Sequence, residues 1–319
     1  MFRYSVYGVV LSSDTGLPEL ERLASTLDTG QVSINVRLGD ADIGDQITAR
    51  WFLRSTFSNS DGLALCGKIE GGYLLRYLGF ADFIVDSAGR ELRCARVEPG
   101  TSPQTLRHLL LDRVLPLVLN LVGHDVLHAT AVVTARGVCA FIGPAGAGKS
   151  TIAASFAAAG YTIFCDDCLV VKVNGGILCT PGYPGVRLWT DSFPALGDQF
   201  ATVCTPAGTN SKFRILGDGG TFPDGLHPLI AIYRISRATD RRPALSAARV
   251  EHLTGSEAFI ELASSAYVLD VTEQSTLRRH FRFIERLVTG IPVGRLWLPN
   301  DLGLLPAARR MILSGLESA

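Results

Sequence analysis

Residues 143–150, which read Gly-Pro-Ala-Gly-Ala-Gly-Lys-Ser, constrain the fold of this chain more than any other segment. They match the pattern G-x-x-x-x-G-K-[ST] in full. The preceding residues 138–142 are apolar and predict a strand, and the alanine-rich residues 149–159 predict a helix that ends at Gly160. A glycine-rich loop at such a junction directs successive backbone N–H groups into one concavity. The segment therefore predicts a loop that holds the phosphates of a nucleotide.

The positions of this loop have expected roles in binding ATP and Mg²⁺. Lys149 would bring its positive charge to the β- and γ-phosphates, and the hydroxyl of Ser150 would bind Mg²⁺. The alternative is a tight glycine-rich turn without a ligand, and the flanking strand and helix favour the nucleotide. The expected nucleotide-binding residues are Gly143, Ala145, Gly146, Ala147, Gly148, Lys149, Ser150 and Thr151.

The chain reaches this loop through a predicted hairpin. Residues 129–134 and 138–142 predict two strands, and residues 135–137 predict the turn between them. Ordinary nucleotide-binding loops of this type follow a buried parallel strand. The hairpin therefore indicates a distinct kinase architecture.

Two adjacent carboxylates, Asp166 and Asp167, follow the next predicted strand, residues 161–165. The carboxyl end of a strand in an α/β fold opens onto the ligand crevice. One carboxylate there can bind Mg²⁺, for which Asp166 is the candidate, and the other can accept a proton from an attacking hydroxyl, for which Asp167 is the candidate. Because neighbouring strand residues point to opposite faces, we expect only one to face the γ-phosphate directly. The alternative is a solvated Asp-Asp turn, and the sequence leaves open which carboxylate is the base.

Four further residues are candidates for catalysis. His128 precedes the hairpin and would tune the proton affinity of the aspartates, although a lone histidine is usually structural. Arg187, Lys212 and Arg214 lie in Gly- and Pro-rich surroundings, where basic residues can close over a transferring phosphate. The alternative for each of these cations is a solvated surface position. Cys165 and Cys168 form a C-x-x-C pair that lacks a second pair to complete a zinc site, so we expect buried thiols.

Composition excludes several other classes of protein. The 30 basic and 30 acidic residues balance without a long run of one sign, which argues against a nucleic-acid-binding face. The longest apolar stretch, residues 109–122, contains Asp112 and Arg113 and is too short to span a membrane. The first 25 residues resemble a strand rather than a signal peptide, so a cytoplasmic location is expected.

The hydrophobic pattern predicts two domains. Residues 1–98 predict a small, mostly β accessory or recognition domain, with strands at 2–11, 31–38, 63–68, 73–78, 82–85 and 91–97. From residue 102 the apolar residues recur at helical spacing, with a bend or break at Pro116. Residues 99–319 are assigned to an α/β kinase domain, with later strands at 169–173, 229–235 and 266–269.

The segment from Leu127-His128-Ala129 to Asp166-Asp167 resembles the HPr kinase/phosphorylase family. The resemblance implies a P-loop kinase core related to the nucleotide-binding core of phosphoenolpyruvate carboxykinase. It also implies that His128 assists catalysis, that Asp167 accepts the proton, that Lys149 contacts the phosphates and that Ser150 holds magnesium. The chain departs from the family's pattern at two places. Thr151 replaces a glutamate of the bifunctional enzymes, and Val186-Arg187 lacks the acid of a Glu-Arg-Gly signature, a loss for which Asp166 would compensate.

Nearly the whole chain is similar to HPr-kinase-like proteins encoded beside lasso-peptide genes. The resemblance rests on residues 7–9, 17–20, 181–189, 212–214 and 291–296. Members of this group phosphorylate a hydroxyl of the precursor peptide, typically its C-terminal serine. The resemblance thus implies an ATP- and Mg²⁺-dependent serine kinase that acts on a peptide or small protein. Two alternatives stay open, an HPr-type kinase that regulates carbon metabolism and a nucleotide-dependent binding module, and a homo-oligomer is also left open.

Overall fold

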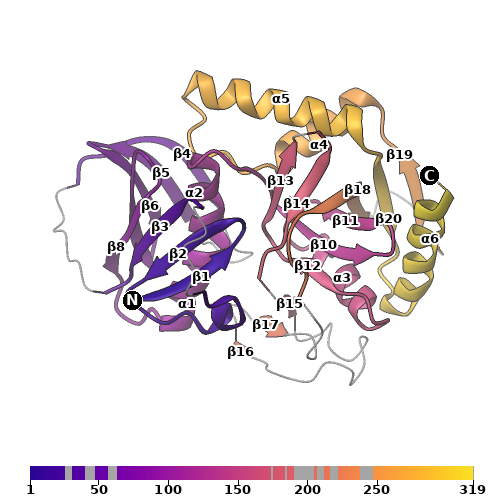
Figure 1. Ribbon diagram of the computed structural model, residues 1–319, viewed down its shortest axis with the longest axis horizontal. Coiled ribbons are helices and arrows are strands. Elements are labelled where there is room, and N and C mark those ends of the chain that lie inside the picture. The colour runs from indigo at the N-terminus through magenta and orange to yellow at the C-terminus, as the bar shows by residue number, and fades with distance from the viewer. Residues whose placement is uncertain are drawn as a thin grey trace. The chain divides into compact units, whose positions relative to one another are not determined.

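The computed structural model (Figure 1) describes residues 1–25, 31–39, 47–56, 63–173, 175–183, 185–189, 205–206, 212–215, 222–237 and 247–318. For residues 54–56, 189, 205–206, 212–215 and 318 it describes the backbone alone. The chain forms two units. The first comprises Met1–His124 with Tyr267–Arg279, and the second comprises Asp125–Ala266 with His280–Ala319. No helix among the described residues has the length and apolar character that a membrane crossing requires.

A mixed sheet of eight described strands forms most of the first unit, in the order β1-β2-β3-β8-β7-β6-β5-β4. The strand β3 pairs in parallel with β2 and with β8, and the other neighbours are antiparallel. The strands are β1 (Phe2–Val6), β2 (Val9–Ser13), β3 (Ser33–Arg37), β4 (Arg50–Thr56), β5 (Leu63–Ile69), β6 (Gly72–Tyr77), β7 (Ala81–Asp86) and β8 (Glu91–Val97).

The strand predictions for this unit are confirmed from β3 to β8 except at β4. The predicted strand 2–11 is wrong as a single element, because Tyr7 and Gly8 both have positive φ and turn the chain between β1 and β2. The strand β4 was not predicted, since its sequence Arg-Trp-Phe-Leu-Arg-Ser-Thr places three large apolar residues in a row and shows no alternation. A 3-10 helix, Pro18–Leu23, follows β2.

A helical segment with a break completes the first unit. The helix α1 (Pro103–Leu109) is capped by Ser102, whose Oγ accepts a hydrogen bond from the N–H of Thr105 at 3.1 Å. A π-helical turn, Leu110–Val114, separates it from α2 (Leu115–Leu121). The helix is thus irregular just before Pro116, which has no N–H to donate to a helical hydrogen bond.

The division between the units lies after this helical segment. Arg107 of α1 pairs with Glu19 at 3.0 Å, and Thr101 donates a hydrogen bond to the carbonyl of Phe80 at 3.0 Å. These contacts place the segment in the first unit, whereas the domain predicted from the sequence to contain it begins at residue 99. Helical periodicity alone does not reveal which sheet a helix covers.

Asp270 attaches residues 267–279 to the sheet of the first unit. Its buried carboxylate accepts hydrogen bonds from Lys68 at 2.7 Å, from Tyr73 at 3.0 Å and from the backbone and hydroxyl of Thr272 at 2.9 and 2.6 Å. Burial alone would raise the pKa of Asp270, but the hydrogen bonds from Lys68, Thr272 and Tyr73 outweigh it and lower this pKa to about 2.

We expect Asp270→Asn to lower the free energy of unfolding by about 2 kcal/mol at neutral pH. A depressed carboxyl pKa stabilises the folded state above the unfolded pKa of 3.8, and this stabilisation is lost as the pH falls towards 2. The difference between wild type and variant should therefore shrink over that interval. Urea denaturation at a series of pH values measures it, and an equal difference at pH 7 and pH 2.5 would contradict this account.

A mixed sheet of nine described strands forms the centre of the second unit. Its main path is β12-β10-β11-β18-β14-β13-β9, and β20 pairs with β18 and with β19. The strands β11, β18 and β20 run in parallel. The bounds are β9 (Asp125–Leu127), β10 (Ala129–Thr134), β11 (Gly137–Ile142), β12 (Ile163–Cys165), β13 (Leu169–Val173), β14 (Ile177–Thr180), β18 (His227–Arg237), β19 (Arg249–His252) and β20 (Val293–Leu298).

Helices cover both faces of this sheet (Figure 1). On one face, Phe141 and Tyr233 of the sheet stack with ring centroids 6.4 Å apart, and Phe156 of α3 packs against Phe141. On the other face, Leu262 and Phe283 pack against the apolar side chains of β10 and β11. The helices are α3 (Lys149–Ala157) and α6 (Leu305–Ser318) on the first face, and α4 (Gly255–Ser265) and the part of α5 (Gln274–Gly290) from His280 onward on the second. A 3-10 helix, Leu302–Leu304, precedes α6.

Three short strands lie outside the nine-stranded sheet. They form an antiparallel sheet in the order β15-β17-β16, with bounds β15 (Val186–Trp189), β16 (Thr205–Pro206) and β17 (Lys212–Ile215).

The strand–loop–helix prediction agrees with the structure of the second unit. The strands β10 and β11 form an antiparallel hairpin in which Ala129 pairs with Ile142, and α3 begins at Lys149 as predicted. The strand β12 is two residues shorter at its start than the predicted 161–165. The predicted strand 266–269 is wrong. Only Ala266 forms an isolated bridge there, because the next residues leave the sheet and Leu269 donates its N–H to Asn120 at 3.3 Å.

Candidate active site

The loop between β11 and α3 has the backbone of an anion-binding concavity. Gly143, Gly146 and Gly148 have φ angles of 140°, 80° and 106°, a region that side chains rarely enter. Gly148 is the N-cap of α3 and offers no side chain to the amides of the first helical turn. The partial positive charge of a helix N-terminus adds to these amide donors. The loop is therefore built to accept negatively charged oxygen atoms.

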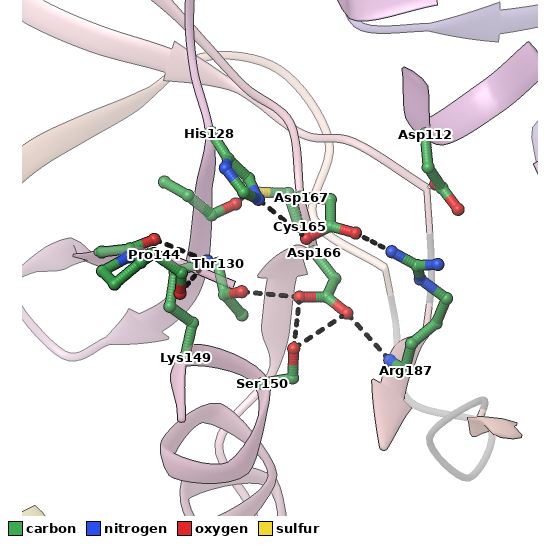
Figure 2. Close-up of polar contacts among 12 residues, drawn as sticks. Asp112, His128, Thr130, Pro144, Lys149, Ser150, Cys165, Asp166, Asp167 and Arg187 are labelled. Carbon is green, nitrogen blue, oxygen red and sulfur yellow. Dashed lines mark hydrogen bonds and ion pairs between the residues drawn. The ribbon is translucent and has the colours of Figure 1, made fainter. Parts of the chain in front are cut away.

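Lys149 lies over the loop that it follows. Its Nζ donates hydrogen bonds to the carbonyls of Gly143 at 2.8 Å and Pro144 at 3.3 Å, and the residue is only 6% exposed (Figure 2). A buried ammonium group needs negatively polarised partners, which these carbonyls supply. The positive charge is thereby held beside the concavity.

Asp166 connects the loop helix to the neighbouring strands. Its Oδ1 accepts hydrogen bonds from Thr130 at 2.6 Å and from Ser150 at 3.0 Å, and its Oδ2 accepts one from the backbone N–H of Arg187 at 2.8 Å (Figure 2). Burial and the nearby charge of Asp167 raise the pKa of Asp166, and they outweigh the opposing effect of Arg187 and the hydrogen bonds. The ionised form of Asp166 is therefore disfavoured, and a cation beside the carboxylate would stabilise it.

Asp167 adopts a backbone conformation that is rare for a residue with a side chain. Its φ is 95°, and its N–H donates to the carbonyl of Ala129 at 3.0 Å. Its carboxylate lies 3.4 Å from Nε2 of His128 and accepts a hydrogen bond from the guanidinium of Arg187. A strained conformation of this kind persists only where surrounding contacts enforce it, and it is concentrated at functional sites.

Both aspartates therefore contact Arg187, and neither lies in a strand, where neighbouring side chains would point to opposite faces. The strand β12 ends at Cys165, and the left-handed backbone of Asp167 redirects the chain. Asp166 receives the backbone N–H of Arg187, and Asp167 receives its guanidinium. The two carboxylates consequently differ in their neighbours: Asp166 lies beside Ser150, and Asp167 lies beside His128.

His128 lies at the break between β9 and β10. Its backbone N–H donates to the carbonyl of Ser265, at the end of α4, at 2.6 Å. The imidazole is partly exposed, with 26% of its side-chain surface accessible. The hairpin strand β10 thus begins with a histidine that is fixed through its backbone and faces one of the two aspartates.

The structure describes the side chain of one of the three basic candidates, Arg187, and only the backbone of the other two, Lys212 and Arg214. Arg187 is buried in β15, so it is not the solvated surface cation of the alternative interpretation. Lys212 and Arg214 belong to β17, where their backbones pair with Trp189 and Arg187. Their side chains lie outside the described part of the chain.

Oxygen donors suited to Mg²⁺ are present beside the loop. The hydroxyl of Ser150 and the carboxylate of Asp166 are 3.0 Å apart, and both are hard ligands. Mg²⁺ is usually held by one or two such groups together with substrate phosphates and water. No group of three His, Cys, Asp or Glu side chains within the described residues forms a metal-binding cluster of its own. The pair Ser150–Asp166 fits a Mg²⁺ ion that arrives with a nucleotide.

Two residues at this site escaped the sequence analysis. Thr130 is fully buried and donates to Asp166, and its only signal was a hydroxyl within the apolar strand β10. Arg237, at the end of β18, donates to the carbonyl of Ala147 at 3.0 Å. This contact joins residues 90 positions apart, so the local sequence carries no sign of it.

The cysteines near the site are buried thiols. Cys165, Cys168 and Cys179 are each at most 1% exposed. Burial raises the pKa of the Cys165 thiol well above its usual range, and the neighbouring Cys168 and Cys179 add to this effect. A thiol of this kind is unreactive, which agrees with the expectation of buried cysteines. Cys204 lies outside the described residues.

Comparisons with known proteins yield a distant similarity to a solved structure. No protein-family model matches the chain. No curated protein matches it either. The solved structure of the HPr(Ser) kinase/phosphatase from Coxiella burnetii is similar at 14% sequence identity, over 60% of this chain and 98% of that chain, with a TM-score of 0.29. A similarity of this size establishes neither an activity nor a ligand for this chain.

Proposed function

We propose that this chain is an ATP- and Mg²⁺-dependent kinase that transfers the γ-phosphate to a serine hydroxyl. One observation carries the proposal: a continuous hydrogen-bonded network links the glycine loop to both aspartates. Ser150, in the first turn of α3, donates to Asp166, and Arg187 binds both Asp166 and Asp167. Phosphate binding, metal binding and proton transfer thus have candidate groups within one network.

The roles follow from the neighbours of each group. Asp167, beside His128, accepts the proton of the serine hydroxyl as its oxygen bonds to the γ-phosphorus. The bond between the γ-phosphorus and the bridging oxygen breaks at the same centre, and ADP leaves. Lys149 neutralises charge that develops on the phosphates. Ser150 and Asp166 would hold Mg²⁺, which would supply positive charge that offsets the negative charge of the phosphates.

The proposed acceptor is the C-terminal serine of a lasso-peptide precursor. Support for this choice is the resemblance of residues 7–9, 17–20, 181–189 and 291–296 to kinases of that group. The basic residues Lys212 and Arg214 would close over the transferring phosphate, in keeping with their place beside Arg187 in the β15–β17 pair.

A phosphorylation assay tests the proposal. The protein is incubated with ATP and Mg²⁺ and with either a lasso-peptide precursor ending in serine, the same peptide with that serine replaced by alanine, or HPr. Mass spectrometry should find one added phosphate on the first peptide alone. Phosphate on HPr and not on the peptide would identify an HPr-type kinase. Release of ADP without any phosphorylated product would instead indicate a nucleotide-dependent binding module, and either result would overturn the proposed acceptor.

A further inference from the structure

Arg237 reaches the glycine loop from the neighbouring strand. The strands β11 and β18 are parallel, and Ile142, the last residue of β11, pairs with Arg234. The strand β18 continues for three more residues, to Arg237, alongside the beginning of the loop. Arg237 pairs there with Leu298 of β20, so its backbone is fixed within the sheet. The guanidinium therefore extends from a rigid element towards the loop.

The contacts of the guanidinium centre on one peptide unit of the loop. Its Nε donates to the carbonyl of Ala147 at 3.0 Å, and its Nη1 donates to Oδ1 of Asn300 at 3.4 Å. A Cβ added to Gly148 would lie 2.7 Å from Nη2 of Arg237. The guanidinium thus occupies space that exists only because residue 148 is glycine.

The geometry of the peptide bond turns this contact into a constraint on the loop. In a trans peptide the carbonyl oxygen and the following N–H point in opposite directions. A hydrogen bond that directs the carbonyl of Ala147 towards Arg237 therefore directs the N–H of Gly148 away from it. Gly148 is the N-cap of α3, where amide donors would receive a phosphate. Fixing this one peptide unit orients a donor of the concavity in advance.

The charges around the loop also point to an anionic ligand. Arg237 and Lys149 both donate to loop carbonyls, and the N-terminus of α3 adds partial positive charge. Cations near a helix N-terminus are unfavourable unless an anion lies among them. A bound phosphate would offset the repulsion between these positive charges.

We infer that Arg237 is a positioning residue that preorganises the glycine loop for phosphate, with Asn300 holding its guanidinium in place. The inference rests on the proposed function, because it takes a nucleotide to be the ligand of the loop. Arg237 acts through the Ala147–Gly148 peptide, so its loss should weaken nucleotide binding more than it slows transfer at saturating ATP.

The test compares four variants by calorimetric titration with Mg²⁺·ATP and by steady-state kinetics. Arg237→Ala should raise the Kd and the KM for ATP by about tenfold to a hundredfold and change kcat by less than about fivefold. Arg237→Lys, which keeps a positively charged donor group, should recover most of this loss, and Asn300→Ala should raise the Kd a few-fold. The matched control is Arg309→Ala, because Arg309 of α6 donates to the carbonyl of Ser155 in α3 and not to a carbonyl of the loop. It should bind ATP like wild type.

A spectroscopic measurement adds a readout that a merely structural role would not affect. With ¹⁵N-glycine labelling, the amide signal of Gly148 should shift in ligand-free Arg237→Ala and stay in place in Arg309→Ala.

An unchanged Kd in Arg237→Ala, with wild type binding ATP, would overturn the inference and leave the proposed function intact. Absence of ATP binding by the wild type would overturn both. If Arg237→Ala does not fold, the Kd values of Arg237→Lys and Asn300→Ala for ATP are compared with that of wild type. If both values are unchanged, the positioning role of Arg237 is refuted.

Discussion

Asp167→Asn is expected to lower the rate of phosphoryl transfer by about 10³-fold, within the usual contribution of a general base. The substitution keeps the size of the side chain but removes the group that accepts the proton of the acceptor hydroxyl. Affinity for ATP should change by only a few-fold, because the carboxylate of Asp167 contacts His128 and Arg187, which lie outside the loop residues 143–150. Single-turnover phosphorylation and calorimetric titration measure the two quantities.

The control for this prediction is Asp301→Asn, the same chemical change at an exposed position. Asp301 accepts a hydrogen bond from the N–H of Gly303 at the start of a 3-10 helix and lies outside the site. Its transfer rate should stay within about twofold of wild type. Because the loss of Asp167 leaves the buried Arg187 with one charged partner fewer, unfolding is followed in parallel, and the rate is measured well below the melting temperature. An Asp167→Asn variant that is folded and loses less than about tenfold in rate would exclude Asp167 as the base.

Lys149→Met should cost about 10²- to 10³-fold in transfer and should also weaken ATP binding. Methionine approximates the length of the lysine but removes the charge that the carbonyls of Gly143 and Pro144 hold beside the concavity. This double effect distinguishes Lys149 from Asp167, whose loss should affect transfer alone. Titration with Mg²⁺·ATP and initial rates over a range of ATP concentrations separate the two effects.

The matched control for this second prediction is Lys172→Met on β13, a partly buried lysine in the same unit. It should leave both ATP affinity and rate within about twofold of wild type. Unchanged ATP affinity in Lys149→Met would mean that the loop does not hold the phosphates through this residue.

The local arrangement of the loop could be predicted because each of its parts has a short-range signal. Glycines at fixed spacing, an apolar hairpin before them and an alanine-rich helix after them all lie within residues 129–159. The start of α3 at Lys149 and the pairing of β10 with β11 agree with that prediction. The prediction succeeded there because the two strands and the helix are mostly apolar and are buried on nearly all sides.

The contacts that bring the site residues together from distant parts of the chain had no such short-range signal in the sequence. The positive φ of Asp167 depends on the contacts around it, and aspartate is compatible with many backbone conformations. Arg187 meets Asp167 across 20 positions, and Thr130 meets Asp166 across 36. Such contacts follow from how the strands pack, which a single sequence does not encode locally. The short run 266–269 failed for the related reason that a few apolar residues suit a strand or a buried loop equally well.

The most direct test of the central claim is a crystal structure of the protein with Mg²⁺ and a non-hydrolysable ATP analogue. The phosphates should lie within hydrogen-bond distance of the amides of residues 146–150, with Lys149 turned towards the γ-phosphate. The Mg²⁺ should lie beside Ser150 and Asp166, and Asp167 should face the γ-phosphorus. A nucleotide bound elsewhere in the molecule, or an empty loop at saturating analogue, would contradict the account.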